Sequence, residues 1–90
     1  MRITLGGKIW ELRFVPYLGP NKRGGCDPPT TKGKAIRICT GQTDQEEMDT
    51  IIHECIHAEG WHIDEVFIER AATDIARVLL RLGYRRNKGE

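Results

Sequence analysis

Apolar and polar positions alternate in two stretches of the first half of the chain. In residues 8–15, Trp10 and Leu12 occupy every second position, which places their side chains on one face of a strand. Residues 34–39 alternate in the same way, and residues 1–7 are a shorter candidate that ends in glycine. The pattern therefore predicts two half-buried strands with a further short strand in front of them.

The connection between these strands, residues 16–33, contains all four prolines and four of the ten glycines of the chain. Proline and glycine at this density interrupt regular elements, so we expect a long loop. A long loop without secondary structure is uncommon in a small domain and usually has a function. Our hypothesis is that this loop shapes a binding site for one specific protein substrate.

The second half of the chain has apolar residues at helical spacing, which predicts two helices. Thr43 and Glu46 have the spacing of a capping box at the start of the first helix, and Gly60 is suited to end it. Asp64 is the expected N-cap of the second helix and Gly83 its stop. The expected apolar stripe of the first helix consists of Met48, Ile51, Ile52, Cys55 and Ile56. That of the second helix consists of Ile68, Ala71, Ala72, Ile75, Leu79 and Leu82.

Strands followed by helices indicate an α+β fold, which we expect to form one domain over residues 1–90. We predict a small antiparallel β-sheet packed on an antiparallel helical hairpin, since the connection between the helices is short. Residues 84–90 form a basic tail that we expect to be frayed. Trp61, Val66 and Phe67 would serve either the core or a dimer face, so the oligomeric state stays open.

The composition, with 39% hydrophobic and 30% charged residues, is that of a soluble globular protein. No apolar run is long enough to cross a bilayer and no signal peptide opens the chain, so we expect a cytoplasmic protein without membrane contact. Three cysteines without a C-x-x-C pair argue against a disulfide framework and for a reducing compartment. A net charge of +1 gives no general bias towards nucleic acid, although the basic residues 81–88 leave such a contact open.

The candidate chemistry is concentrated in residues 53–57, His-Glu-Cys-Ile-His, which have the pattern H-E-x-x-H. Residues four apart share one face of a helix, so His53 and His57 can direct two imidazole nitrogens at one point about 2 Å from each. This suits zinc, whose catalytic sites have three protein ligands and one position for water. Glu54 projects to a different side of the helix and can act as the general base on that water. On this interpretation Zn²⁺ is the cofactor.

Three residues are candidates for the third metal ligand. A metzincin-type extension would need histidine at position 63, where the chain has Ile63. If the second helix folds back along the first, Glu65 lies nearest to the level of His57 and Glu69 lies one turn deeper. We predict Glu65 as the third ligand, with Glu69 and then His62 as alternatives. A carboxylate that does not bind the metal would orient one of its ligands.

Residues 34–83 combine a strand, a short turn, Ile-Ile-His-Glu-x-x-His-Ala and a helix with an early glutamate. This order resembles the compact zincins of the ImmA/IrrE type and, through His-Glu-Cys-Ile-His-Ala, those of the SprT type. It looks most like the small H-E-x-x-H proteins of phages and prophages, which would place the protein in the host cytoplasm. The resemblance implies that the two histidines bind zinc, that Glu54 is the general base and that Glu65 corresponds to the third-ligand glutamate. It also implies that residues 34–39 are the edge strand that receives an extended peptide.

Together these features predict a zinc-dependent metallopeptidase that hydrolyses a peptide bond in a protein substrate. His62, or Tyr84 if the tail folds back, is a candidate for stabilising the oxyanion. The alternative is a non-catalytic, zinc-stabilised module that binds protein or nucleic acid. In that case a fourth protein ligand, such as Cys26 or His62, would close the metal site. Cys26 is also a candidate for an inhibitory thiolate.

Overall fold

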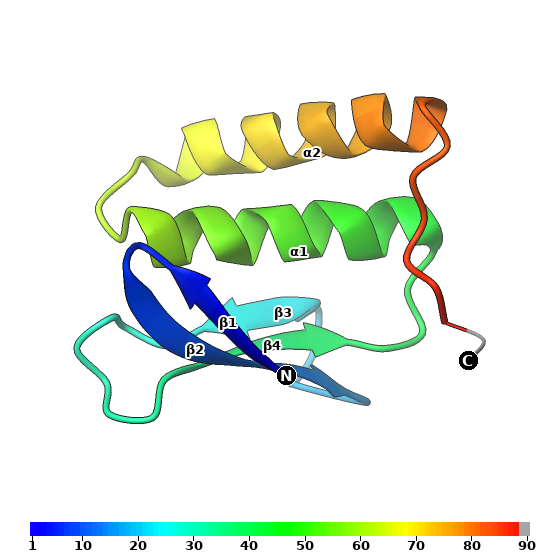
Figure 1. Cartoon of the computed structure of the whole chain (residues 1–90). Coiled ribbons are helices and arrows are strands. Elements are labelled where there is room, and N and C mark those ends of the chain that lie inside the picture. Colours follow the sequence, from blue (N-terminus) through cyan, green and yellow to red (C-terminus); the bar gives the residue numbers. More distant parts are fainter. Residues whose placement is uncertain (89–90) are drawn as a thin grey trace.

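Two helices lie above a four-stranded sheet in the computed structural model, which describes residues 1–88 (Figure 1). The elements in chain order are β1 (Arg2–Leu5), β2 (Lys8–Val15), β3 (Gly24–Cys26), β4 (Ala35–Cys39), α1 (Asp44–Glu59) and α2 (Glu65–Arg81). Figure 1 shows the two helices antiparallel, with α1 between the sheet and α2. The predicted α+β fold is therefore confirmed.

The sheet is mixed, with the strand order β1-β2-β4-β3. The β1–β2 and β3–β4 pairs are antiparallel, but β2 and β4 run parallel, with Leu12 opposite Ile36. The prediction of a purely antiparallel sheet is therefore wrong at this pair. The long connection between β2 and β4 is the physical reason, because it carries the chain back along the sheet and lets β4 start at the same end as β2.

That connection is not the structureless loop that its proline and glycine content predicted. Residues 24–26 form β3, and the carboxylate of Asp27 accepts hydrogen bonds of 2.9 Å from the backbone N–H of Ala35 and from Nη1 of Arg37. Because β3 takes the outer position, β4 is paired on both sides. The expectation that residues 34–39 form the edge that receives a peptide is therefore wrong. The edge strands are β1 and β3, and β3 is the one that lies beside β4.

Both helices begin with the caps that the sequence predicted. Thr43 Oγ1 accepts a hydrogen bond of 3.2 Å from the N–H of Glu46, and the Glu46 carboxylate accepts one of 3.1 Å from the N–H of Thr43. The Asp64 carboxylate accepts a hydrogen bond of 3.0 Å from the N–H of Phe67. The first residue of each helix is therefore fixed by local hydrogen bonds.

The most buried face of α1 is largely polar and consists of Glu47, Thr50, Glu54 and Ala58. These residues are three or four positions apart and face the sheet. The predicted apolar stripe of α1 is only partly buried, because α1 is the middle layer and packs against both the sheet and α2. Within the part of the chain that the structure describes, no fully buried side-chain nitrogen or oxygen lacks a hydrogen-bond partner: Glu47 and Thr50 are hydrogen-bonded, and the Glu54 side chain lines a cleft that is open to solvent. The polar face is therefore compatible with burial.

Below α1, the core that joins this helix to the sheet is formed by Trp10, Ile36, Ile38 and Ala58. Trp10 is only 1% exposed, and its indole N–H donates a hydrogen bond of 3.0 Å to the carbonyl oxygen of Leu5. The alternation predicted for residues 8–15 is thus confirmed at Trp10.

Helix α2 packs on α1 alone among the described elements. Its inner face consists of Ile68, Ala72 and Ala76, which are fully buried. The predicted stripe is confirmed at Ile68 and Ala72, whereas Ile75 and Leu82 are 44% and 69% exposed. They are exposed because the apolar arc of α2 is wider than its contact with α1. Neither helix combines the length and the apolar composition needed to cross a bilayer.

The basic tail after α2 is docked onto the start of α1. Nε and Nη2 of Arg86 donate hydrogen bonds of 2.9 and 3.0 Å to the two carboxylate oxygens of Glu47. The guanidinium group also lies 4.1 Å from the centre of the Phe14 ring. Arg86 therefore links the tail to α1 and β2.

Two further tail residues pair with the first residue of α1. Nε of Arg85 is 3.4 Å and Nζ of Lys88 is 3.1 Å from the carboxylate of Asp44. The expectation of a frayed tail is therefore wrong for residues 84–88, and residues 89–90 lie outside the described residues. Sequence alone could not reveal these contacts, because the partners are far apart along the chain.

Candidate metal centre

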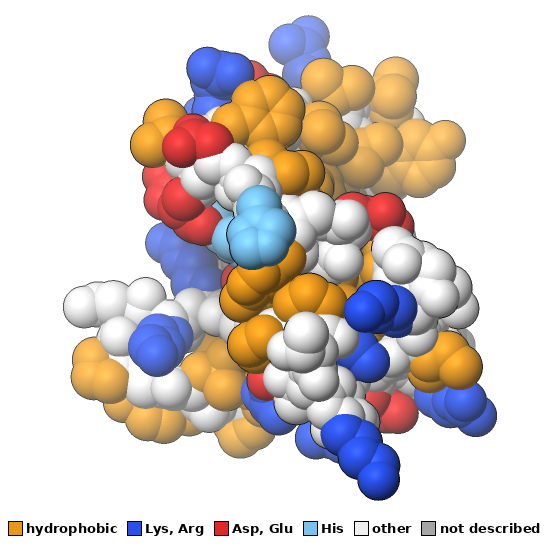
Figure 2. Space-filling model, turned by 90° about the vertical axis from the view of Figure 1, so that its left-hand side faces the viewer, with side chains coloured by type: hydrophobic (Ala, Val, Ile, Leu, Met, Phe, Trp, Pro, Cys, Tyr) orange, Lys and Arg blue, Asp and Glu red, His pale blue; other side chains and the backbone are white. Residues whose placement is uncertain are grey.

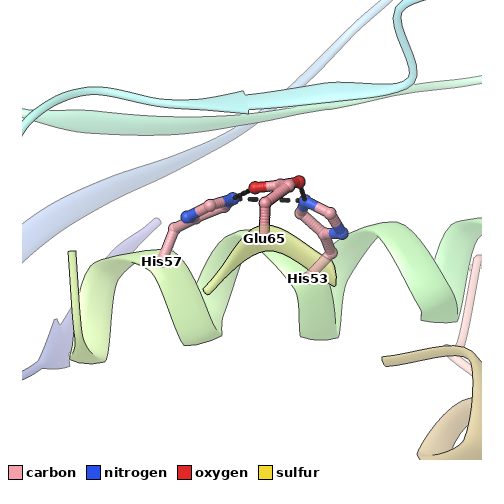
Figure 3. A group of neighbouring side chains, drawn as sticks. All are labelled: His53, His57 and Glu65. Carbon is pink, nitrogen blue, oxygen red and sulfur yellow. Dashed lines mark hydrogen bonds and ion pairs between the residues drawn. The ribbon is translucent and has the colours of Figure 1, made fainter. Parts of the chain in front are cut away.

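The structure brings the side chains of His53, His57 and Glu65 together between α1 and α2 (Figure 3). The Nε2 atoms of the histidines are 3.2 Å apart, and each lies 3.0 Å from one carboxylate oxygen of Glu65. Figure 3 shows both rings rising from the same face of α1 towards this carboxylate. Of the three candidates for the third ligand, Glu65 is therefore the one that joins the histidines.

The short turn between the helices produces this arrangement. The N–H of Ile63 donates a hydrogen bond of 3.0 Å to the carbonyl oxygen of Gly60, at the end of α1. A Cβ on Gly60 would lie 2.5 Å from Cδ1 of Ile63, so glycine lets this side chain lie against the end of α1. Asp64 then caps α2 and makes Glu65 its first helical residue, which lies beside the second half of α1.

The three side chains fit a small divalent cation. Lone pairs that converge this closely repel one another unless imidazole protons or a cation lie between them. Around tetrahedral zinc, with bonds of about 2.0–2.1 Å, neighbouring ligand atoms are about 3.3 Å apart, which is close to the spacing here. Two imidazole nitrogens and one carboxylate oxygen are also a donor set that catalytic zinc sites use. Their role as metal ligands stays a prediction that this geometry supports.

Glu54 lies beside the metal-ligand candidates but faces the sheet. It is 8% exposed, and the pKa of its carboxyl group is raised, chiefly by burial. The charge of His53 opposes this shift and the charge of Glu65 adds to it. Glu54 and His53 line the same cleft. In general, a general base has to be within reach of the water that it activates, and it works best with a pKa closer to neutrality than that of an exposed glutamate.

Strand β3 packs directly over Glu54 because residue 24 is glycine. A Cβ on Gly24 would lie 2.6 Å from Cγ2 of Thr50, 3.0 Å from the carbonyl oxygen of Arg37 and 3.3 Å from Cγ of Glu54. By contrast, a Cβ on Gly25 would meet no described atom within 4 Å. The proline and glycine content of residues 16–33 predicted a loop here, so the close packing of Gly24 on α1 was not predicted. The signal that could have revealed it is a glycine pair directly before an apolar residue.

A cleft of about 450 Å³ opens beside His53. Residues from the β2–β3 connection, β3, α1 and α2 line it, namely Asn21, Lys22, Arg23, Gly24, Asp49, Thr50, His53, Glu54 and Glu69. At the end of the molecule where the helices meet, Figure 2 shows acidic side chains beside histidine, and apolar side chains over much of the neighbouring upper surface. The metal-ligand candidates therefore lie next to a charged cleft that is open to solvent.

The other candidate residues lie outside the group of three. Glu69 follows Glu65 by one turn of α2 and lines the cleft. His62 is exposed in the turn and is not part of the group that can hold a metal. Tyr84 follows the far end of α2, a helix of 17 residues and thus about 25 Å long. The expectation that Tyr84 stabilises an oxyanion at this site is therefore wrong.

Cys26 faces the core. Its Sγ donates a hydrogen bond of 3.4 Å to the carbonyl oxygen of Asp27, and burial raises the pKa of the thiol to about 12, with a further contribution from the charge of Glu54. The thiol is therefore neutral, and neither the spare-ligand nor the inhibitory-thiolate interpretation of Cys26 fits its surroundings. Cys39 is buried and Cys55 partly buried, as expected for small core residues.

His53, His57 and Glu65 thus form a group that could hold a metal ion, with the buried Glu54 beside it. Comparison with protein-family models, with characterised proteins and with solved structures finds no match to this chain.

Proposed function

We propose that the protein is a zinc-dependent metallopeptidase that hydrolyses a peptide bond in a protein substrate. The observation that carries this proposal is the convergence of His53, His57 and Glu65 at 3.0–3.2 Å beside the buried Glu54. The side chain of Glu65 is 53% exposed, so one side of the group is open to water and substrate. Three protein ligands with an open position are typical of catalytic zinc sites, whereas structural sites are closed by a fourth ligand.

Glu54 is the residue that moves protons in this proposal. It takes the proton of the attacking water and passes it to the leaving amine. Its burial between α1 and β3 restricts the carboxylate and keeps bulk water from its sheet side. Zinc held by His53, His57 and Glu65 would supply a Lewis acid and lower the pKa of a bound water to about 7.

The substrate would bind along the free edge of β3 in an extended conformation. The backbone of Arg23 accepts a hydrogen bond from Cys39, and that of Asp27 donates one to Ala35, so both residues face β4. In an antiparallel ladder the backbone groups of successive residues face opposite sides, so those of Gly24 and Cys26 point away from β4. The β3 edge therefore replaces residues 34–39 as the proposed peptide-binding strand.

The non-catalytic alternative has less support. Among the described residues the group has no fourth metal-binding side chain, because neither Cys26 nor His62 belongs to it. Binding to nucleic acid through the tail also has less support, because Arg85, Arg86 and Lys88 already pair with carboxylates of α1.

The test is to measure zinc content and hydrolysis of fluorescently labelled casein for the wild type and three variants. We expect about one zinc per chain in the wild type, with zinc lost in Glu65→Gln and retained in Glu69→Gln. Glu54→Gln should keep zinc but lose at least about 100-fold in hydrolysis. A wild type that binds no zinc, or a Glu54→Gln variant of unchanged activity, would overturn the proposal.

A further inference from the structure

The cleft beside His53 continues past the start of β3 to Lys22 and Arg23. These two cations lie on the segment that leads directly into the proposed peptide-binding strand. They are not part of the metal centre, and nothing in the proposed mechanism uses them. Their position raises the question of which part of a bound peptide they would meet.

The backbone that carries these cations is held firmly to the rest of the molecule. The carbonyl oxygen of Arg23 accepts hydrogen bonds of 2.8 Å from the N–H of Cys39 and 3.3 Å from Nε2 of Gln42. The carbonyl oxygen of Lys22 accepts a hydrogen bond of 3.3 Å from Sγ of Cys39. Asn21, with φ of 59°, forms the preceding turn. The two side chains therefore project from a fixed segment.

Both cations are available to a ligand. The ammonium group of Lys22 has no hydrogen-bond or ion-pair partner among the described residues. Nη2 of Arg23 is 3.4 Å from Glu46, but the two side chains are 60% and 40% exposed, and ion pairs this exposed are weak. A carboxylate that entered the cleft could therefore pair with either residue at little cost.

The direction of β3 determines which part of the substrate meets them. A peptide that pairs with this edge in the antiparallel sense, the more stable arrangement per residue, runs opposite to β3. Its carboxyl-terminal side then passes the start of β3 and reaches Arg23 and Lys22. The opposite wall of the cleft is acidic, with Asp49 and Glu69. Asp49 already accepts a hydrogen bond of 2.7 Å from the hydroxyl of Thr73, and Glu69 lies on the helix layer, away from the line of β3.

We propose that Lys22 and Arg23 form a specificity subsite for a carboxylate on the carboxyl-terminal side of the cleaved bond. The carboxylate would come from an aspartate or glutamate side chain or from the end of the substrate chain. This inference rests on the proposed peptidase function, because it takes the direction of the substrate from the peptide bound along β3.

The test separates binding from hydrolysis. Binding of dye-labelled extended peptides to zinc-loaded Glu54→Gln protein is measured by fluorescence anisotropy, with peptides that differ in a single Glu, Gln or Lys at each position. A second set compares free with amidated carboxyl termini, which distinguishes a side-chain carboxylate from a terminal one. We expect peptides with Glu at positions on one side, or with a free carboxyl terminus, to bind roughly fivefold to tenfold more tightly than the corresponding peptides with Lys or with an amidated terminus. Cleavage products of the wild type, identified by mass spectrometry, should place that acidic group after the cleaved bond.

Charge variants then assign the preference. Lys22→Glu should abolish or reverse it and Arg23→Gln should weaken it, whereas the control Lys32→Glu, an exposed residue outside the cleft, should retain it. Circular dichroism checks that each variant is folded. The subsite proposal would be overturned if Lys22→Glu still preferred peptides with Glu. It would also be overturned if the wild type preferred peptides with Lys and Glu69→Gln removed that preference. Hydrolysis without a charge preference would reject the subsite and leave the peptidase proposal standing. Charge-selective binding without hydrolysis would reject the peptidase proposal and leave only a carboxylate-binding site at Lys22 and Arg23.

Discussion

The contact between Arg86 and Glu47 predicts a large loss of stability when Arg86 is replaced by alanine. The side chain of Glu47 is only 5% exposed and accepts both hydrogen bonds from Arg86, while Lys88 lies 3.7 Å away. Removing one partner of a buried ion pair costs about 3–5 kcal/mol, because it leaves the other charge buried. Arg86 is 37% exposed and Lys88 remains near the carboxylate, so we expect a smaller loss of about 2–3 kcal/mol.

Urea denaturation at neutral pH, followed by circular dichroism, measures this loss directly. With about 2.1 cal/mol/K of unfolding entropy per residue, a 90-residue chain should show a Tm lower by about 10–15 °C. The matched control is Arg85→Ala, which removes a pair with Asp44 whose side chains are 50% and 53% exposed and should cost less than about 1 kcal/mol. Adding Glu47→Met to the Arg86→Ala variant should recover most of the loss, because no buried charge then remains.

The pH dependence of this difference tests its electrostatic origin. Arg86 is the largest cause that lowers the pKa of Glu47 below its ordinary value of 4.5. The contribution to stability is therefore fully present above pH 4.5 and is lost as the pH falls through the lower pKa of the folded state. The stability difference between wild type and Arg86→Ala should shrink over that range. Equal losses for Arg86→Ala and Arg85→Ala, or a difference that does not change with acidification, would refute the reasoning.

Two further predictions concern the candidate site. Gly24→Ala should lower the free energy of unfolding and the rate of hydrolysis, because its methyl group would meet Thr50, whereas the control Gly25→Ala should change both little. Adding Thr50→Ser, which deletes the clashing methyl group, should restore part of the loss. Equal effects of the two glycine variants would contradict this reasoning. Removing metal with a chelator should lower Tm and change the fluorescence of Trp61, because the Trp61 ring lies 6.0 Å from the ring of His57. The same fluorescence change in a Trp61→Phe variant would show that another residue causes it.

The features that the sequence predicted well are determined by neighbours in the chain. The capping box of Thr43 and Glu46, the stop at Gly60 and the cap at Asp64 each need only a few consecutive residues, so composition and spacing are sufficient. The same local signals led to Glu65 as the third member of the candidate metal site, because a short turn forces the start of α2 to lie beside the end of α1.

The features that the sequence did not predict depend on contacts between distant residues. Alternation shows that residues 34–39 form a strand, but not which neighbours it pairs with, so its internal position and the parallel pairing were missed. Helical periodicity likewise identified an apolar stripe on α1 but could not show that α1 is a middle layer with Glu47 and Glu54 facing the sheet. Strand β3 has three residues, too few for a periodic signal.

Helix α2 packs only on α1 among the described elements, so a metal ion held by residues of both helices would bind more tightly when α2 is docked. His53 and His57 come from α1, whereas Glu65 comes from α2, so a metal ion at this site would tie the two helices together at the turn. Metal affinity and the docking of α2 are then thermodynamically linked, and each must change the other by the same free energy. A substitution at Ala72 or Ala76, which pack against α1 but are not candidate ligands, would therefore weaken metal binding by weakening the docking of α2.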